Sequence, residues 1–306
     1  VFFPILFLLL AFVIGLSSGA TVLVGQAWGA KNIEKVRTIV GSLLFITLIG
    51  GTIIALVGAF FSKHILLLLG IDPKIMHLSL PYVRWMLLGS PFLFIYITYT
   101  SILRGVGDST TPLIASGLTI VVGMITTPIL IRGYFGFPQM GIVAPAIASI
   151  LGFIGVLIFL YIYLNKKNHV LRPDAALIAH IRHHPELSRI ILRLGIPTGI
   201  QMVTNSVAGL VVIGLVNQYG AHATAAYGAV NQVLNYIQFP ALSIAIAGSI
   251  FAAQAIGAGK SELLAKVTKV ALLSNIVITG SLVIIAYLAS KYLMALFITD
   301  PTVIEL

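Results

Sequence analysis

A row of polar side chains follows one face of a predicted helix that starts near residue 226. Tyr227, Asn231, Asn235 and Gln238 are spaced by four, four and three residues, which places them on one side of an α-helix, with Gln232 beside them. Amides bind through hydrogen bonds, and a tyrosine ring attracts positive charge without the desolvation cost of a fixed carboxylate. The stripe therefore predicts a site for small amphiphilic or cationic organic molecules.

The helix before it carries a second stripe, formed by Thr198, Gln201 and Asn205. Amides that face lipid are costly, so both stripes should face a cavity or one another. Hydrogen bonding between the two helices, without any ligand, is the structural alternative.

The composition requires a membrane around these helices. Hydrophobic residues make up 59% of the 306 residues, charged residues 8%, and the mean hydropathy is +1.09. Since a spanning helix needs about 20 apolar residues, we expect an all-α integral membrane protein whose first partner is the lipid bilayer. Eight apolar runs are long enough, near residues 1–27, 38–61, 80–103, 113–132, 142–164, 194–218, 226–253 and 267–290.

The chain also contains an internal duplication. The sequence QAWGA at 26–30 recurs as QAIGA at 254–258, and the offset of 228 continues without a gap (254 − 26 = 228). Six spans separate the two starts, so both copies cross in the same direction and form two parallel-repeat helical lobes. We expect Gln26 and Gln254 to tie a span end to its loop, with direct substrate contact as the alternative. The repeat motif comprises Gln26, Gly29, Gln254 and Gly257, and further pairs are Glu34 with Glu262, Ser62–Lys63 with Ser290–Lys291, and Asp72–Pro73 with Asp300–Pro301.

The longest polar stretch divides the lobes. We expect an N-terminal lobe at 1–164, a linker at 165–193 and an incomplete C-terminal lobe at 194–306. When loops are numbered alternately, 13 of the 18 basic residues fall on the linker side, which the positive-inside rule makes cytoplasmic in an inner (plasma) membrane. The basic charge is then an orientation signal, and nucleic-acid binding is not expected. Leu177, Ile178 and Ile181 permit a short amphipathic helix on the membrane surface.

The repeat also predicts the extent of the protein, and glycine spacing predicts some of its packing. The first copy runs to about residue 164, so the second should reach about 392, and its first helix has no counterpart in the first copy (194 − 228 = −34). We therefore expect a fragment that lacks one span before and about three after its eight. Gly15 and Gly19 should let two helix backbones approach closely.

Several motifs together resemble the multidrug and toxic compound extrusion (MATE) transporters. They are GATVLVGQAWGAKN from residue 19, LRGVGDSTTP at 103–112, GIPTGIQ from 195, VNQYGAHATAAYGAVNQV from 216, and AAQAIGAGK from 252. The resemblance covers the family's second to ninth helices. It implies two six-helix lobes in a V-shaped arrangement, twelve helices when complete, alternating access, and export of organic compounds in exchange for H⁺ or Na⁺.

The acidic residues depart from the family's pattern, because all eight lie in loops or at span ends. Members similar to the NorM branch carry a glutamate where this chain has Asn205. The DinF-like branch carries an asparagine and an aspartate where this chain has Gly123 and Thr127. The coupling carboxylate is then expected in the absent helices, or a neutral site binds Na⁺ through carbonyl and amide oxygens.

Catalysis and metal binding are not expected. The chain has no Cys, and His180, His183 and His184 form a surface cluster without a carboxylate placed to complete a metal shell. GLSSG at 15–19 and GKS at 259–261 lack the strand–turn–helix context of the enzyme motifs that they match. We expect a monomer without catalytic residues or cofactor, and the alternatives to drug export are a lipid-linked sugar flippase and an uncoupled channel or structural protein.

Overall fold

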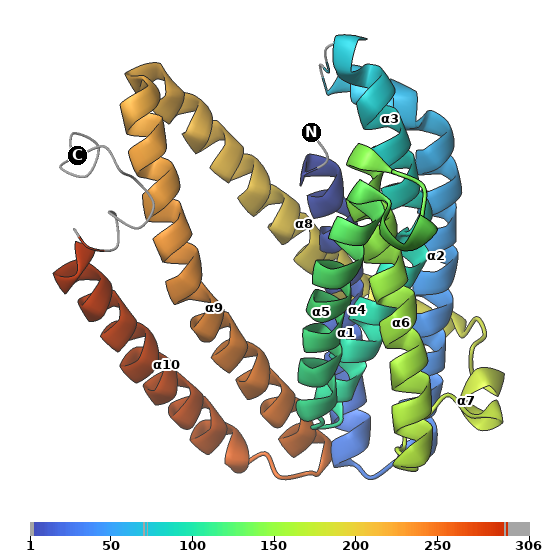
Figure 1. Cartoon of the computed structure of the whole chain (residues 1–306). Coiled ribbons are helices and arrows are strands. Elements are labelled where there is room, and N and C mark those ends of the chain that lie inside the picture. The colour runs from blue at the N-terminus through green and yellow to red at the C-terminus, as the bar shows by residue number, and fades with distance from the viewer. Residues whose placement is uncertain (1–2, 70, 72, 291, 293–306) are drawn as a thin grey trace. The chain divides into compact units, whose positions relative to one another are not determined.

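The computed structural model describes residues 3–69, 71, 73–290 and 292, and every regular element among them is helical (Figure 1). This confirms the predicted all-α class. The repeat partners Asp72, Lys291, Asp300 and Pro301 lie outside the described residues. The α-helices are α1 (Phe3–Gly29), α2 (Ile33–Leu68), α3 (Pro73–Leu88), α4 (Ser90–Gly105), α5 (Thr110–Arg132), α6 (Ala144–Lys166), α7 (Ala175–Ala179), α8 (Pro185–Val216), α9 (Ala221–Gly257) and α10 (Leu263–Leu288).

In the described part of the chain, seven helices are long and apolar enough to span a membrane, and α3 with α4 would make an eighth. The sequence predicted one continuous run at 80–103, whereas the structure bends by 44° between α3 and α4. Pro91 has no N–H for the Leu87 carbonyl, and the Ser90 hydroxyl donates to that carbonyl instead, at 2.7 Å. A Cβ on Gly89 would lie 2.4 Å from Ile150 Cγ1, so the break also brings α6 close.

The chain folds as two compact units, an N-terminal unit (Val1–Gln201) and a C-terminal unit (Met202–Leu306). The main core of the N-terminal unit lies between α1, α2, α4 and α6, while in the C-terminal unit α9 packs along α10. The lobe limits 1–164 and 194–306, predicted from the polar stretch at 165–193, stay predictions. Fully buried large side chains of the N-terminal core include Leu16, Ile39, Leu43, Ile102, Leu103 and Leu164.

The duplication is visible in the backbone. Helices α1 and α9 end at Gly29 and Gly257, which are 228 residues apart (257 − 29 = 228). After α1, three N–H groups close the last turn, and the same three bonds recur after α9 with N···O distances of 2.9–3.0 Å in both copies. They form Schellman motifs with left-handed residues at Lys31 (φ 55°) and Gly259 (φ 68°). The bonds are Ala30→Gln26, Lys31→Trp28 and Asn32→Ala27, then Ala258→Gln254, Gly259→Ile256 and Lys260→Ala255.

The glycines of α1 pack as the sequence predicted. A Cβ on Gly15 would lie 2.6 Å from the Gly195 carbonyl oxygen, and one on Gly19 would lie 2.7 Å from Leu194 Cβ. A Cβ on Gly195 would in turn lie 2.8 Å from the Leu16 Cα. The two backbones therefore touch, with glycines on both sides of the contact between α1 and α8.

The predicted linker is more ordered and more buried than its polarity suggests. Helix α6 continues to Lys166, α7 supplies the expected short helix, and α8 begins at Pro185, nine residues before the predicted span. Leu171 and Leu177 are 0% and 1% exposed and belong to the main N-terminal core. Leu177 thus fixes α7 to the core beside α2, whereas Ile178 of the same helix is 58% exposed.

Replacing Gly195 by Ala should destabilise the N-terminal unit by about 1–3 kcal/mol, because the added methyl meets backbone atoms that cannot rotate away. The melting temperature of the purified protein measures this effect. Gly117→Ala in α5 is the matched control, since a Cβ there meets no atom within 4 Å and should leave stability equal or slightly higher. Equal melting temperatures for both variants would mean that the α1–α8 contact is not tight.

Candidate functional site

The polar stripe predicted near residue 226 lies on one helix, α9, in the C-terminal unit. Tyr227, Asn231, Asn235 and Gln238 occupy one face of its first five turns, as their spacing required. Tyr227 and Asn231 are half-buried, whereas Asn235 and Gln238 are exposed. Asn231 Nδ2 donates to the Tyr227 carbonyl at 3.1 Å, a bond within the helix that leaves its amide oxygen available.

The other amides of the stripe are not used to hold helices together. Within the described residues of the C-terminal unit, Asn205, Asn235 and Gln238 make no hydrogen bond to one another or to α10. Within the C-terminal unit, these contacts give no support to pairing between Asn205 and the α9 stripe. The assignment of the stripes to a substrate site stays a prediction.

Helix α8 carries the second stripe across the boundary of the two compact units. Thr198 and Gln201 belong to the N-terminal unit and Asn205 to the C-terminal unit. The Thr198 hydroxyl donates to the Leu194 carbonyl at 3.2 Å, one residue after Pro197, which itself donates no backbone hydrogen bond. Gln201 and Asn205 are exposed.

One polar contact in the C-terminal unit escaped the sequence analysis. Asn275 of α10 donates through Nδ2 to the Ala241 carbonyl of α9 at 3.4 Å, and its Oδ1 accepts from the Thr279 hydroxyl at 2.7 Å. Ala241 follows Pro240, the proline inside α9, so the contact joins α10 to α9 directly after the stripe ends. The signal in the sequence was Asn275 itself, because an amide within an apolar span needs a hydrogen-bond partner.

The described spans carry no acidic side chain. Glu34, Asp108, Asp174, Glu186 and Glu262 all lie in loops or at helix ends. Gly123 and Thr127 lie on α5, where a Cβ on Gly123 would meet no atom within 4 Å. In the described part of the chain, no three His, Asp or Glu residues are grouped so that they could hold a metal ion.

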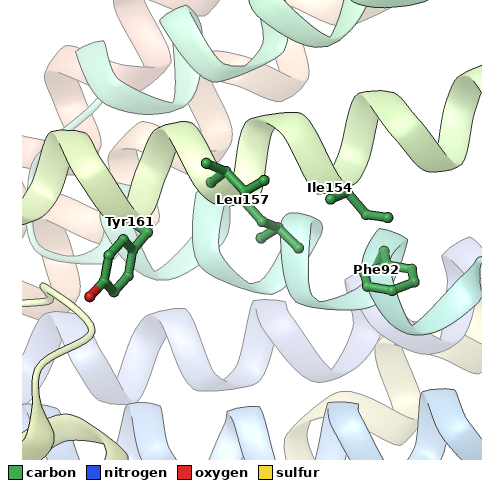
Figure 2. A pocket seen from close by; sticks show the side chains of 5 residues that line it. Phe92, Ile154, Leu157 and Tyr161 are labelled. Carbon is green, nitrogen blue, oxygen red and sulfur yellow. The ribbon is translucent and has the colours of Figure 1, made fainter.

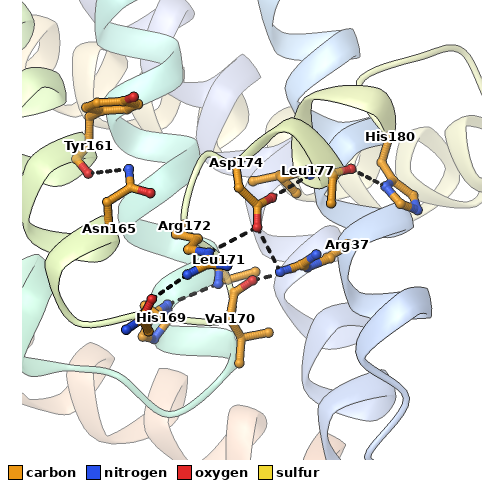
Figure 3. A network of polar contacts seen from close by, with 12 residues as sticks. Arg37, Tyr161, Asn165, His169, Val170, Leu171, Arg172, Asp174, Leu177 and His180 are labelled. Atoms are coloured by element: carbon orange, nitrogen blue, oxygen red, sulfur yellow. Dashed lines mark hydrogen bonds and ion pairs between the residues drawn. The ribbon is translucent and has the colours of Figure 1, made fainter.

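A polar network holds the loop after α6 and the start of α7 against α2 (Figure 3). Asp174 caps α7 by accepting from the Leu177 N–H at 2.8 Å. Its other oxygen accepts from Arg37 of α2 at 3.3 Å and from Arg172 at 3.0 Å. Arg37 also donates to the Val170 carbonyl at 3.3 Å.

Two further contacts bring the loop after α6 against α4 and the loop that follows it. The Tyr99 hydroxyl donates to the Leu171 carbonyl at 2.8 Å. His169 Nε2 lies 3.8 Å from Asp108 Oδ2, and Asp108 caps α5 by accepting from the Thr111 N–H at 3.0 Å. The loops after α4 and α6 and the start of α2 therefore share one end of the N-terminal unit, which we name the linker end.

The electrostatics of the linker end favour a charged Asp174 and a neutral His169. The Leu177 N–H bond, together with Arg172 and Arg37, holds the pKa of the Asp174 carboxyl below its usual value. Burial lowers the pKa of His169, although Asp108 opposes this shift. The lowered pKa weakens the charge interaction between His169 and Asp108, whose side chains join the two loops.

Comparison with known proteins decides the family. The model of the MatE family matches residues 1–129 and 197–306, one stretch in each copy of the repeat. The chain belongs to the MatE family. Members of this family are transporters. The match confirms the resemblance to the MATE transporters that the sequence motifs predicted.

The relatives of this MatE chain are named as drug-resistance proteins. It is 42% identical over 299 residues to the probable multidrug resistance protein YoeA of Bacillus subtilis. The alignment covers 98% of this chain and 65% of the relative. It is 28% identical over 296 residues to the probable multidrug resistance protein NorM of Thermotoga maritima, at 96% and 62% coverage. The chain thus spans somewhat less than two thirds of these relatives.

Solved structures share the same fold. A crystal structure of MATE in complex with MaD3S superimposes with a TM-score of 0.88 at 22% identity, covering 99% of this chain and 67% of that one. An outward-facing multidrug resistance MATE transporter of the MOP superfamily gives 0.86 at 21% identity, with the same coverage. At these identities the likeness establishes the MatE fold of the chain.

Replacing Asp174 by Asn should lower the melting temperature by a few degrees at neutral pH, because the amide keeps the α7 cap but loses both arginine partners. A carboxyl whose pKa is depressed by folding contributes stability above its unfolded pKa, and that contribution is lost as pH falls through the folded pKa. The difference between wild type and D174N should therefore shrink below about pH 4. Melting curves across pH measure it.

Glu186→Gln is the control, since Glu186 is another acid at a helix start but has no ion pair among the described residues. This variant should behave like wild type at every pH. If E186Q lowered the melting temperature at neutral pH as much as D174N does, the arginine pairs of Asp174 would have no specific role.

Proposed function

We propose that the protein exports small organic compounds, amphiphilic or cationic, as a secondary multidrug transporter. The observation that carries the proposal is the α9 stripe: within the described C-terminal unit its exposed amides serve no helix contact. Family membership and relatives named multidrug resistance proteins support the same activity. Neutral amides and a tyrosine ring suit cations of varied shape, because binding needs no fixed charge geometry.

Export is coupled to H⁺ or Na⁺ by alternating access in this proposal. Because the described spans contain no carboxylate, the neutral oxygens of Asn, Thr and backbone groups are the ligands that this part of the chain offers, and they suit Na⁺ better than H⁺. The positively charged linker end faces the cytoplasm of an inner membrane, and the protein acts as a monomer.

A lipid-linked sugar flippase is the less favoured function. Such a protein needs Arg or Lys in its cavity to hold a pyrophosphate. The stripe residues of α8 and α9 include neither. An uncoupled channel is distinguished from a transporter by the response to ion gradients.

Cells that express the protein should extrude a cationic dye faster than cells without it, and the difference should vanish when the proton and sodium gradients are both collapsed. Fluorescence of preloaded cells measures efflux, with a single ionophore for each ion assigning the coupling. Efflux that continues at full rate without either gradient would contradict coupled export.

The double change Asn231→Leu and Asn235→Leu should reduce dye efflux to the background of cells without the protein, because it removes the binding amides from the α9 face. Ser243→Leu, a polar residue of α9 off the stripe whose hydroxyl bonds its own helix, is the matched control and should retain efflux. Membrane amounts of all variants are compared by immunoblot. Normal efflux by the double variant would remove the stripe from the substrate site.

A further inference from the structure

The pocket between α4 and α6 in the N-terminal unit is lined almost entirely by hydrocarbon (Figure 2). It offers a ligand one hydrogen-bonding side chain, that of Tyr161. The polar contact that bears on the proposed site lies in the C-terminal unit instead, between α9 and α10. The lining of the pocket is Phe92 of α4 with Ile154, Leu157, Ile158 and Tyr161 of α6.

Helix α9 contains a proline directly after its polar stripe. The last stripe residue is Gln238, so Pro240 divides α9 into a stripe half (221–239) and a second half (241–257). Proline has no N–H, and the usual helical bond from residue 240 to the Tyr236 carbonyl is therefore missing. Helices bend most readily at such a position, yet α9 is continuous here.

Helix α10 holds α9 at this proline. Asn275 Nδ2 donates to the Ala241 carbonyl at 3.4 Å, and the Thr279 hydroxyl donates to Asn275 Oδ1 at 2.7 Å, which orients the amide. Both polar side chains are half-buried, whereas Ile276 and Val277, which follow Asn275, are 60% and 62% exposed. The polar pair therefore lies on the side of α10 that faces α9.

A second contact fixes the half of α9 beyond the proline. A Cβ on Gly248 would lie 3.1 Å from the Ala271 Cβ, so α9 and α10 approach closely there. On the other side of the proline, the stripe amides of Asn235 and Gln238 make no hydrogen bond to α10 within the described C-terminal unit. The direction of the stripe half therefore depends on the bond at Ala241.

The first copy of the repeat lacks this arrangement. At the 228-residue offset, the proline and the two polar residues of α10 correspond to Phe12, Thr47 and Gly51. The Thr47 hydroxyl donates to the Leu43 carbonyl of its own helix at 2.9 Å, and α1 still packs on α2. The fold of this helix pair thus does not require the proline and its amide partner, which occur in the copy that carries the stripe.

We propose that Asn275, oriented by Thr279, is a positioning residue that sets the direction of the stripe half of α9. By holding the Ala241 carbonyl, it keeps α9 straight at Pro240 and presents the stripe amides to a substrate as one surface. Without this bond the stripe half tilts, and binding weakens although every binding group is still present. The effect on binding rests on the proposed export function, whereas the effect on the helix does not.

Hydrogen exchange of the purified protein, measured by mass spectrometry, tests the stripe half directly. Asn275→Leu keeps the size of the side chain but removes both hydrogen bonds. The backbone amides at 228–239 should then exchange roughly threefold to tenfold faster, as expected for the loss of one hydrogen bond between helices. The amides at 245–257 should keep the wild-type rate, because the contact at Gly248 remains.

Two further variants control this result. Thr279→Val removes only the hydroxyl that orients the amide, and it should change exchange at 228–239 in the same direction but to a smaller degree. Ser274→Ala removes a neighbouring hydroxyl of α10 for which the described residues provide no hydrogen bond, and it should leave both segments unchanged.

Pro240→Ala supplies the missing N–H and should make the bond from α10 unnecessary. Asn275→Leu added to this variant should therefore exchange like P240A alone, whereas a general loosening of the unit by leucine would persist. In dye efflux, N275L should raise the apparent KM roughly fivefold at an unchanged maximal rate and an unchanged membrane amount, and the P240A background should remove this difference.

Equal exchange at 228–239 in the wild type and N275L, or faster exchange that P240A does not suppress, would overturn the proposal. An N275L variant that loses maximal rate at an unchanged KM would overturn it as well. If the wild type showed no dye efflux while the exchange pattern held, the proposed export would be wrong and the role of Asn275 in α9 would stand.

Discussion

Hydrocarbon offers no partner for a peptide N–H or C=O, and this single constraint organises the whole chain. Helices keep their bonds internal, and Ser and Thr hydroxyls within them, such as those of Thr21, Thr47 and Ser116, donate to carbonyls of their own helix. The ends of α1, α4, α6 and α9 close themselves with backbone bonds around a left-handed residue. Because the ends are closed, few polar side chains are needed in the spans, and those that occur stand out.

The same constraint explains how the bundle tolerates its irregularities. Where Pro91 cannot donate, the Ser90 hydroxyl supplies the missing bond, and α3 and α4 bend at Gly89 while α6 packs into the bend. Next to Pro240, which lies inside the continuous helix α9, Asn275 of α10 donates to the Ala241 carbonyl. In both places a polar side chain bonds a carbonyl beside a proline. Asn235 makes no such contact to another helix within the described C-terminal unit, so it requires a different explanation.

Local rules in the sequence predicted much of the fold. Hydropathy located the spans, the 228-residue offset located the repeat that recurs in the turns after α1 and α9, and the spacing of Gly15 and Gly19 predicted the contact with Gly195. The docking of the linker was not predicted, because it depends on Arg37 meeting Asp174, 137 residues away. The spacing of the stripe residues correctly placed them on one helix. Which residues face the stripe depends on the packing of other helices, and the spacing within one helix carries no information about that packing.

The two copies of the repeat give a reason to assign the stripe to function and not to folding. Both copies have the same three backbone bonds after the helix, 228 residues apart, so both satisfy the backbone groups at that helix end. The stripe is not shared, since the equivalent positions in the first copy are apolar. Amides in a membrane span are costly, and a fold that forms with apolar residues at these positions does not need them. Their presence in the second copy alone is what a binding surface added to one lobe would produce. The pairs are Asn231 with Phe3, Asn235 with Phe7 and Gln238 with Leu10.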